Sequence, residues 1–283
     1  MGVVVETIDA IGVTRISRWI FNCYLIHDGG DGAPVVIDAG LSGVVHDLVA
    51  VMDSLGLALP ELAGIFATHG HSDHVGGAPA LSAQSGAPIC LPSRTLSYVA
   101  GEIPRSPSAA AIARIWPTVF DQPFDRRGAL DAMRGAKVAG YGTSSGMRWP
   151  AERRLRPLVD GDCLPGAPAW QVITSPGHTD DSLSFWHPGT ATLLSGDAVL
   201  SVDGRAWITP ETVDDGLNAD TAARLRRLDV AHLLPGHGRP VHGAAVTARA
   251  WAPDDHPRRL ASVCGAVTRR LGGRGASTRS TRQ

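Results

Sequence analysis

One short stretch, THGHSDHVGG at residues 68–77, constrains this chain more than any other. It contains four side chains that can bind a metal ion: His69, His71, Asp73 and His74. The stretch directly follows the compact apolar run LAGIFAT at 62–68, which predicts a buried strand. Side chains two residues apart on an extended segment share a direction, so His69 and His71 can approach one ion together. The pattern therefore predicts a metal site at the end of a strand.

Three further residues occupy the same kind of position later in the chain. His178, Asp197 and His237 each follow a short apolar run and a Gly or Pro-Gly turn. Imidazole nitrogens and carboxylate oxygens suit a divalent cation such as zinc. A ligand presented at the end of a strand, four separate times, is how an α/β scaffold builds a site along one edge of a sheet.

The remaining hydrophobic patterns predict the elements that carry these residues. We expect strands over 3–8, 22–27, 34–39, 62–68, 87–92, 154–161, 169–175, 182–187, 191–196 and 230–236. We expect helices over 42–56, 77–86, 218–228 and most of 243–271, with helical patches at 93–100 and 108–115. Ser42 and Asn218 are the predicted N-caps of two of these helices. Interleaved strands and helices in both halves predict an α/β protein whose sheets are covered by helices.

The chain reads as a single domain over residues 1–271. Residues 93–150 carry many prolines and bulky side chains, and they leave the core just after the first ligand cluster. We therefore expect this segment to be an insert that lies over the site as a lid. Residues 272–283, GGRGASTRSTRQ, predict a disordered basic tail.

Charge and composition narrow the classes of partner. A net charge of −1 creates no global field for nucleic acid or an anionic membrane. The N-terminal segment lacks the pattern of a secretory signal, and the four cysteines are far apart, so we expect a cytoplasmic protein with free thiols. The expected partner is a small-molecule substrate; neither nucleic acid nor a membrane is expected, and a homodimer is left open.

The order H-x-H-x-D-H, then His, Asp and His, with VIDAG upstream, resembles the metallo-β-lactamase fold superfamily over about residues 20–240. The glyoxalase II and lactonase branch is the most similar. The resemblance implies a four-layer αβ/βα sandwich with two divalent metal ions at the sheet edge, most often zinc, with manganese and iron also accepted.

The resemblance also assigns the ligands. It implies a first metal bound by His69, His71 and His178. It implies a second metal bound by Asp73, His74 and His237. Asp197 would bridge the two metals, and Asp38 of the VIDAG segment would support the site from behind without binding metal.

The chemistry expected from such a site is hydrolysis. Two dications lower the pKa of a shared water, which then attacks an electrophilic carbonyl or phosphorus. Asp73 or Asp197 would move the proton, and the sequence does not choose between them. The aromatic side chains predicted to contact an apolar substrate are Trp116, Phe120, Trp149 and Trp207.

The chain differs from individual branches of this superfamily, and these differences narrow the range of activities that we expect. Metallo-β-lactamases typically have Cys or Ser at the position of Asp197, and lactonases usually have a tyrosine where this chain has Leu200. Glyoxalase II proteins carry a C-terminal helical domain that binds glutathione, whereas the roughly 46 residues after His237 are predicted to be mostly one helix and a basic tail. We expect a dinuclear hydrolase that cleaves a small ester, thioester or lactone. The alternatives are a phosphodiesterase or nuclease at the same site, a mononuclear-iron enzyme that oxidises a thiol or persulfide, and a non-catalytic binding protein.

Overall fold

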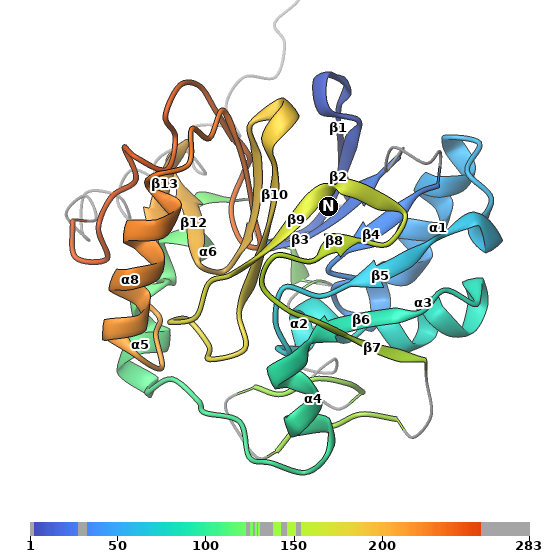
Figure 1. The fold of residues 1–283 in the computed structure, drawn as a ribbon, viewed down its shortest axis with the longest axis horizontal. Coiled ribbons are helices and arrows are strands. Elements are labelled where there is room, and N and C mark those ends of the chain that lie inside the picture. Colours follow the sequence, from blue (N-terminus) through green and yellow to red (C-terminus); the bar gives the residue numbers. More distant parts are fainter. Residues whose placement is uncertain are drawn as a thin grey trace, which may run out of the picture.

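A computed structural model describes residues 3–27, 33–122, 125–126, 128, 130, 138–142, 146–150 and 154–255. Its first sheet has seven strands (Figure 1). In spatial order they are β1 (Val4–Ile8), β2 (Val13–Arg18), β3 (Phe21–Ile26), β4 (Val35–Ile37), β5 (Gly64–Phe66), β6 (Ile89–Pro92) and β7 (Leu155–Leu158). Strands β1 to β4 pair antiparallel, whereas β4 to β7 pair parallel.

The second sheet faces the first and has six strands. In spatial order they are β15 (Val241–His242), β14 (His232–Pro235), β11 (Thr192–Gly196), β10 (Leu183–His187), β9 (Ala167–Thr174) and β8 (Cys163–Leu164). Only β11 and β14 pair parallel among them. A separate antiparallel hairpin consists of β12 (Val199–Val202) and β13 (Arg205–Ile208).

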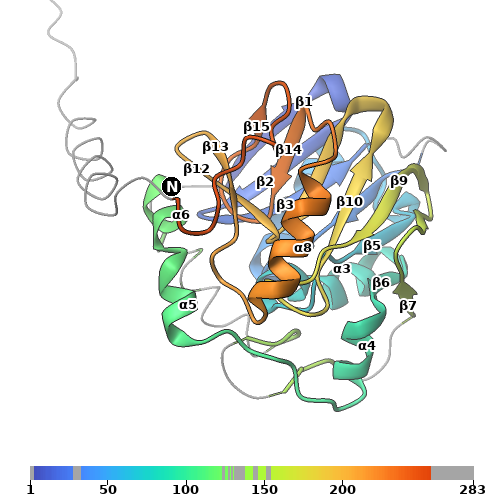
Figure 2. The same ribbon diagram turned by 60° about the vertical axis from the view of Figure 1, so that its left-hand side comes forward.

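Helices cover the outer faces of both sheets (Figures 1 and 2). The α-helices are α1 (Val45–Ser54), α2 (Ser72–Val75), α3 (Ala78–Ser85), α4 (Ser93–Val99), α5 (Ala109–Arg114), α6 (Trp116–Asp121) and α8 (Asp215–Leu225). Short 3-10 turns are η1 (Asp9–Ile11), η2 (Ser42–Val44), η3 (Leu59–Glu61) and η4 (Pro188–Thr190). No helix in these described ranges is long and apolar enough to cross a membrane.

The alternating direction of side chains along each strand produces the layers of the fold. On β4, Val35 and Ile37 pack between the two sheets, in the same buried cluster as Leu194 of β11. The intervening Val36 packs in another buried cluster with Leu48 of α1. Because side chains alternate across a strand, a wholly apolar strand contributes to both clusters. The four-layer αβ/βα sandwich is therefore confirmed.

Hydrogen bonds join the two sheets where the ligand-bearing strands end. The backbone N–H of Leu183 donates to the carbonyl of Thr68 at 2.7 Å. The backbone N–H of Asn22 donates to Gly236 at 3.1 Å, and its side-chain amide donates to Pro235 at 2.8 Å. The loops that follow β5 and β14 are consequently held at one common edge.

Five of the described strands were not predicted from the sequence: β2, β8, β12, β13 and β15. In β2, the polar sequence VTRISR hides the strand, although five of its six residues are buried. Arg15 is buried because its guanidinium donates to Glu6 at 2.9 Å and to Asn22 at 3.1 Å. A buried arginine with two partners does not produce the apolar alternation on which the prediction relied.

Three local predictions were wrong. Ser42 begins a 3-10 turn and does not cap α1, whose N-cap is Val44. Asp214 caps α8, because its carboxylate accepts from the Leu217 backbone N–H at 3.1 Å, so Asn218 lies inside the helix. Residues 243–255 form turns where a helix was predicted.

The segment 93–150 crosses from one half of the molecule to the other. Helix α4 packs beside β6 and β7, while α5 and α6 lie by the β12–β13 hairpin (Figure 2). There Ile115 packs against the buried cluster of Leu200, Val202 and Trp207. The predicted tail at 272–283, and the predicted helix beyond residue 255, lie outside the described residues.

Candidate metal centre

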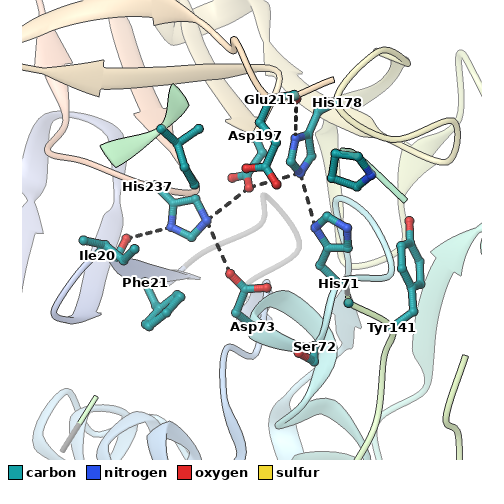
Figure 3. Close-up of a pocket in the computed structure, with 13 residues that line it drawn as sticks. Ile20, Phe21, His71, Ser72, Asp73, Tyr141, His178, Asp197, Glu211 and His237 are labelled. Carbon is teal, nitrogen blue, oxygen red and sulfur yellow. Dashed lines mark hydrogen bonds and ion pairs between the residues drawn. The ribbon is translucent and has the colours of Figure 1, made fainter. Parts of the chain in front are cut away.

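The seven predicted ligands meet at the edge where the two sheets are joined. Figure 3 shows His71, Asp73, His178, Asp197 and His237 among them. Their positions come from the ends of strands and from the short helix α2. His69 and His71 follow β5, and Asp73 and His74 lie on α2. The other three follow β9, β11 and β14: His178, Asp197 and His237. Parallel pairing of β4 with β5 and of β11 with β14 brings these strand ends to the same edge.

The first group of ligands consists of three imidazoles. His71 Nδ1 lies 3.0 Å from His69 Nε2 and 3.2 Å from His178 Nε2. These three residues form one of the groups whose donor atoms all lie within 4.8 Å of one another. It is the set that the resemblance implied for the first metal.

The second group contains Asp73, His74 and His237. His237 Nε2 lies 3.3 Å from Asp73 Oδ2, and His74 Nε2 lies 3.7 Å from the same oxygen. Asp197 lies between the two groups. Its Oδ2 is 3.4 Å from His178 Nε2, 3.1 Å from His237 Nε2 and 3.5 Å from His74 Nε2. A carboxylate in this position can contact cations in both groups.

The outer nitrogen of four imidazoles is held by a hydrogen bond. His178 Nδ1 donates to the Glu211 carbonyl at 2.9 Å, and His237 Nδ1 donates to the Ile20 carbonyl at 2.9 Å. His74 Nδ1 donates to Asp38 Oδ2 at 2.9 Å. His69 Nδ1 lies 3.1 Å from the Thr68 hydroxyl, which donates its own hydrogen to Asp38. Such partners fix the tautomer of a metal-binding imidazole.

In the neutral form of each imidazole, these tautomers leave the inner nitrogen without a proton. In the first group, Nε2 of His69 and of His178 each point a lone pair at His71 Nδ1, which can donate one hydrogen at most. Among the described residues, His74 Nε2 and Asp197 Oδ1 are buried without a hydrogen-bond partner. Converging lone pairs and unpaired buried acceptors are stabilised by cations. The donor set therefore fits two divalent metal ions.

Electrostatics differ between the two groups. Burial, together with neighbouring His178, lowers the pKa of His71 to about 3, so it is neutral and ready to bind metal. Burial acts in the same direction on His237, yet the carboxylates of Asp197 and Asp73 raise its pKa to about 10. A proton between His237 and these carboxylates occupies the place that a cation can take.

Glycine at position 236 is required by the close approach of the ligands. A Cβ atom there would lie 2.2 Å from Asp197 Oδ1 and 2.8 Å from His74 Cε1. One of these side chains would have to shift to admit the extra atom, and either shift would disturb the candidate metal centre. Gly236, in the PGHG sequence at 235–238, thus allows His237, which follows β14, to lie close to Asp197.

A cavity of about 180 Å³ opens onto the ligands. It is lined by Ile20, Phe21, His71, Ser72, Asp73, Pro107, Ile115, Tyr141, Gly142, His178, Asp197, Glu211 and His237. Pro107, Ile115, Tyr141 and Gly142 come from the segment 93–150, which supplies part of the cavity wall.

The four aromatic residues predicted to contact substrate lie elsewhere and do not line this cavity. Trp207 is fully buried in a cluster with Leu200, and Trp149 packs against the core beside the first sheet. Trp116 is about half exposed and stacks on Phe120 with ring centroids 5.4 Å apart. Composition showed that the segment is aromatic, but the direction of each side chain depends on how its helices pack.

Sequence reasoning missed three residues around the site. Asp181 is buried and accepts from the Gly70 backbone N–H at 3.0 Å, the Thr95 hydroxyl at 2.6 Å and the Tyr141 hydroxyl at 2.6 Å. It thereby fixes the loop between His69 and His71 and ties residue 141 to it. Position 181, three residues after a predicted ligand in GHTDDS, was the available signal. For Tyr141 the sequence offered only its place among the aromatic residues of the segment 93–150, and for Glu211 it offered no signal.

Asp38 lies where the resemblance placed it, behind the ligands. Its carboxylate accepts from the Thr68 backbone N–H, the Thr68 hydroxyl and His74 Nδ1, at 2.8, 2.8 and 2.9 Å. Its φ of 53° lies in the left-handed region. Aspartate and asparagine adopt that region more readily than most residues.

Comparison with known proteins agrees with the fold. Residues 18–237 match the family model of the metallo-beta-lactamase superfamily, so the chain belongs to that superfamily. It is a metal-dependent hydrolase by class. Among curated relatives, it is 25% identical over 259 residues to the "Probable metallo-hydrolase YflN" of Bacillus subtilis, covering 83% of this chain and 86% of that one.

Two further comparisons bear on the site. A hydroxyacylglutathione hydrolase of Cereibacter sphaeroides is 27% identical over 180 residues, which cover 63% of this chain and 48% of that enzyme. A crystal structure of a protein in a di-iron-bound form aligns with a TM-score of 0.53 and 25% identity, over 84% of this chain and 96% of that one.

Proposed function

We propose that this protein is a dinuclear metallohydrolase that cleaves a small ester, thioester or lactone. The observation that carries the proposal is the position of Asp197 Oδ2, which lies within 3.5 Å of ring nitrogens from both ligand groups: His178, His74 and His237. A single carboxylate oxygen shared in this way suits two neighbouring cations. A mononuclear site would not need a carboxylate oxygen that is shared between two groups of ligands.

The metal ions, when bound, would supply a hydroxide nucleophile near neutral pH and polarise the substrate carbonyl. Asp73 is the better placed of the two aspartates to move the proton to the leaving group. Its side chain is 21% exposed at the cavity, whereas that of Asp197 is 4% exposed. Ile20 and Phe21 border the same space, where they restrict water around the reacting atoms.

The relatives and the cavity favour attack on a carbonyl carbon over attack on phosphorus. Hydroxyacylglutathione hydrolases are among the sequence relatives, and their name denotes the hydrolysis of an acyl-glutathione. The cavity of about 180 Å³ suits a small molecule. We propose zinc as the metal because its ligands here are imidazoles and carboxylates, and iron is the principal alternative because the di-iron-bound structure has a similar fold.

The test is metal content, measured by inductively coupled plasma mass spectrometry, beside hydrolysis of acyl esters, thioesters, lactones and bis(p-nitrophenyl) phosphate. We expect about two metal ions per chain, falling toward one or none in Asp197→Asn. Asp203→Asn is the matched control, because Asp203 is exposed and does not line the cavity.

Three outcomes would refute the proposal. Faster hydrolysis of the phosphodiester than of any acyl substrate would identify a phosphodiesterase. One iron per chain, with oxygen consumption on a persulfide, would identify a redox enzyme. Full hydrolytic activity in a metal-free preparation would exclude metal-dependent hydrolysis.

A further inference from the structure

Glu211 places a carboxylic side chain in the cavity beside the metal centre. The residue lies in the loop between β13 and α8, and it is 8% exposed. Its backbone carbonyl accepts from His178 Nδ1 at 2.9 Å, which anchors the residue next to the first ligand group. Figure 3 shows Glu211 on the same side of the cavity as His178 and Asp197.

Within the part of the chain that the structure describes, the carboxylate of Glu211 makes no hydrogen bond or ion pair, although the imidazoles of His178 and His237 act on it electrostatically. The hydrogen bonds of this residue there are made by its backbone carbonyl, to His178 and Thr209. Glu211 also belongs to none of the three groups of potential metal ligands found among those residues. A nearly buried carboxylate without a hydrogen bond or ion pair is costly, so the arrangement points to a group that arrives from outside.

Part of the cavity wall is apolar. Ile20 and Phe21 lie beside His237, with the Phe21 and His237 ring centroids 5.5 Å apart. Pro107 and Ile115 extend the apolar lining. A molecule that fills the cavity thus meets the hydrocarbon of Phe21 as well as the carboxylate of Glu211, and Figure 3 shows these two residues at different sides of the cavity.

We propose that Glu211 is a specificity-determining residue, which binds a protonated amine of the substrate and disfavours a substrate that carries a carboxylate in its place. The inference rests on the proposed hydrolase function, and it names the class of acyl substrate: a small amino ester or amino thioester. A buried carboxylate attracts an ammonium group strongly, because little water screens the pair. The same low screening makes a substrate carboxylate repel it.

A set of three metal-chelating probes separates this role from catalysis. The probes are 3-aminopropanohydroxamic acid, propanohydroxamic acid and succinic monohydroxamic acid, whose tails are cationic, neutral and anionic. Their Kd values are measured by isothermal titration calorimetry on metal-loaded wild type, Glu211→Gln and Glu61→Gln. Glu61 is exposed and does not line the cavity, so it is a control with the same chemical change.

We expect the wild type to bind the cationic probe at least about tenfold more tightly than the anionic one. Glu211→Gln should reduce that ratio by about tenfold or more, with metal content equal to wild type, while Glu61→Gln keeps the wild-type ratio. An unchanged ratio in Glu211→Gln, or equal weakening of all three probes, would overturn the inference.

Ester hydrolysis by the wild type, measured in parallel, tests the proposed function separately. A protein that shows the charge preference without hydrolysing any acyl ester would refute the hydrolase proposal and keep the binding role of Glu211. A protein that hydrolyses esters without the charge preference would refute the role of Glu211 alone.

Discussion

Replacing Asp38 with asparagine should weaken the second metal site and leave the fold intact. The carboxylate of Asp38 accepts three hydrogen bonds, two from Thr68 and one from His74 Nδ1. Asparagine has nearly the same shape and tolerates the left-handed φ of 53° at this position. The substitution therefore changes hydrogen bonding without adding backbone strain.

The expected loss of metal affinity follows from the number of hydrogen-bond donors around position 38 that cannot become acceptors. The side-chain amide nitrogen of the introduced asparagine would face either the Thr68 backbone N–H or the N–H of His74, and neither of these can become an acceptor while His74 keeps its ligating tautomer. An opposed buried donor costs about 1–3 kcal/mol. If the asparagine turns its nitrogen toward His74, that cost falls on the metal-binding tautomer. We expect the second-site affinity to fall about 10- to 100-fold, the usual effect of removing a partner behind a metal ligand.

The assay is a metal titration of Asp38→Asn against a competing chromophoric chelator, which resolves the two binding steps. The control is Asp203→Asn, because Asp203 is an exposed aspartate with a similar φ of 51°. Weakening confined to the second step supports the reasoning. Unchanged affinities at both steps would refute it, because His74 would then not depend on Asp38 for its orientation.

Three other perturbations have expected outcomes. Gly236→Ala places a Cβ 2.2 Å from Asp197 Oδ1, so it should displace that carboxylate and lower both metal content and thermal stability; a variant with two metals and the wild-type Tm would contradict this. Removing metal with a chelator should lower the Tm, because an ion at about a thousand times its Kd stabilises the folded state by about 4 kcal/mol, and an unchanged Tm would speak against a preformed site. His237 has a folded pKa of about 10, above its ordinary value of 6.5, so its protonation stabilises the metal-free fold fully below pH 6.5, and this contribution is lost as the pH rises through about 10. Urea unfolding of metal-free protein at about pH 7 and about pH 9.5 should show this loss, which His237→Gln should reduce.

Hydrophobic patterns in the sequence predicted most of the strands that precede ligands, because β5, β11 and β14 are buried on both faces. A run such as LAGIFAT is apolar throughout, and a polar ligand at its end interrupts it visibly. The same reasoning failed for β2, where Arg15 is buried with Glu6 and Asn22 as partners. It also failed at the ends of α1 and α8, since the choice of cap depends on the backbone geometry of the preceding loop.

By itself, the sequence determined the superfamily and the layered fold. It also predicted seven ligand-type residues that converge at one edge, because spacing along a strand end and after a turn encodes which side chains can reach one ion. Only the tertiary structure decided what surrounds those ligands. The contacts of Asp181, Tyr141 and Glu211 join residues far apart in the chain, and the predicted contact residue Trp207 is buried in a different cluster. Their positions depend on how a crossing segment packs between two halves, and no local pattern records such long-range packing.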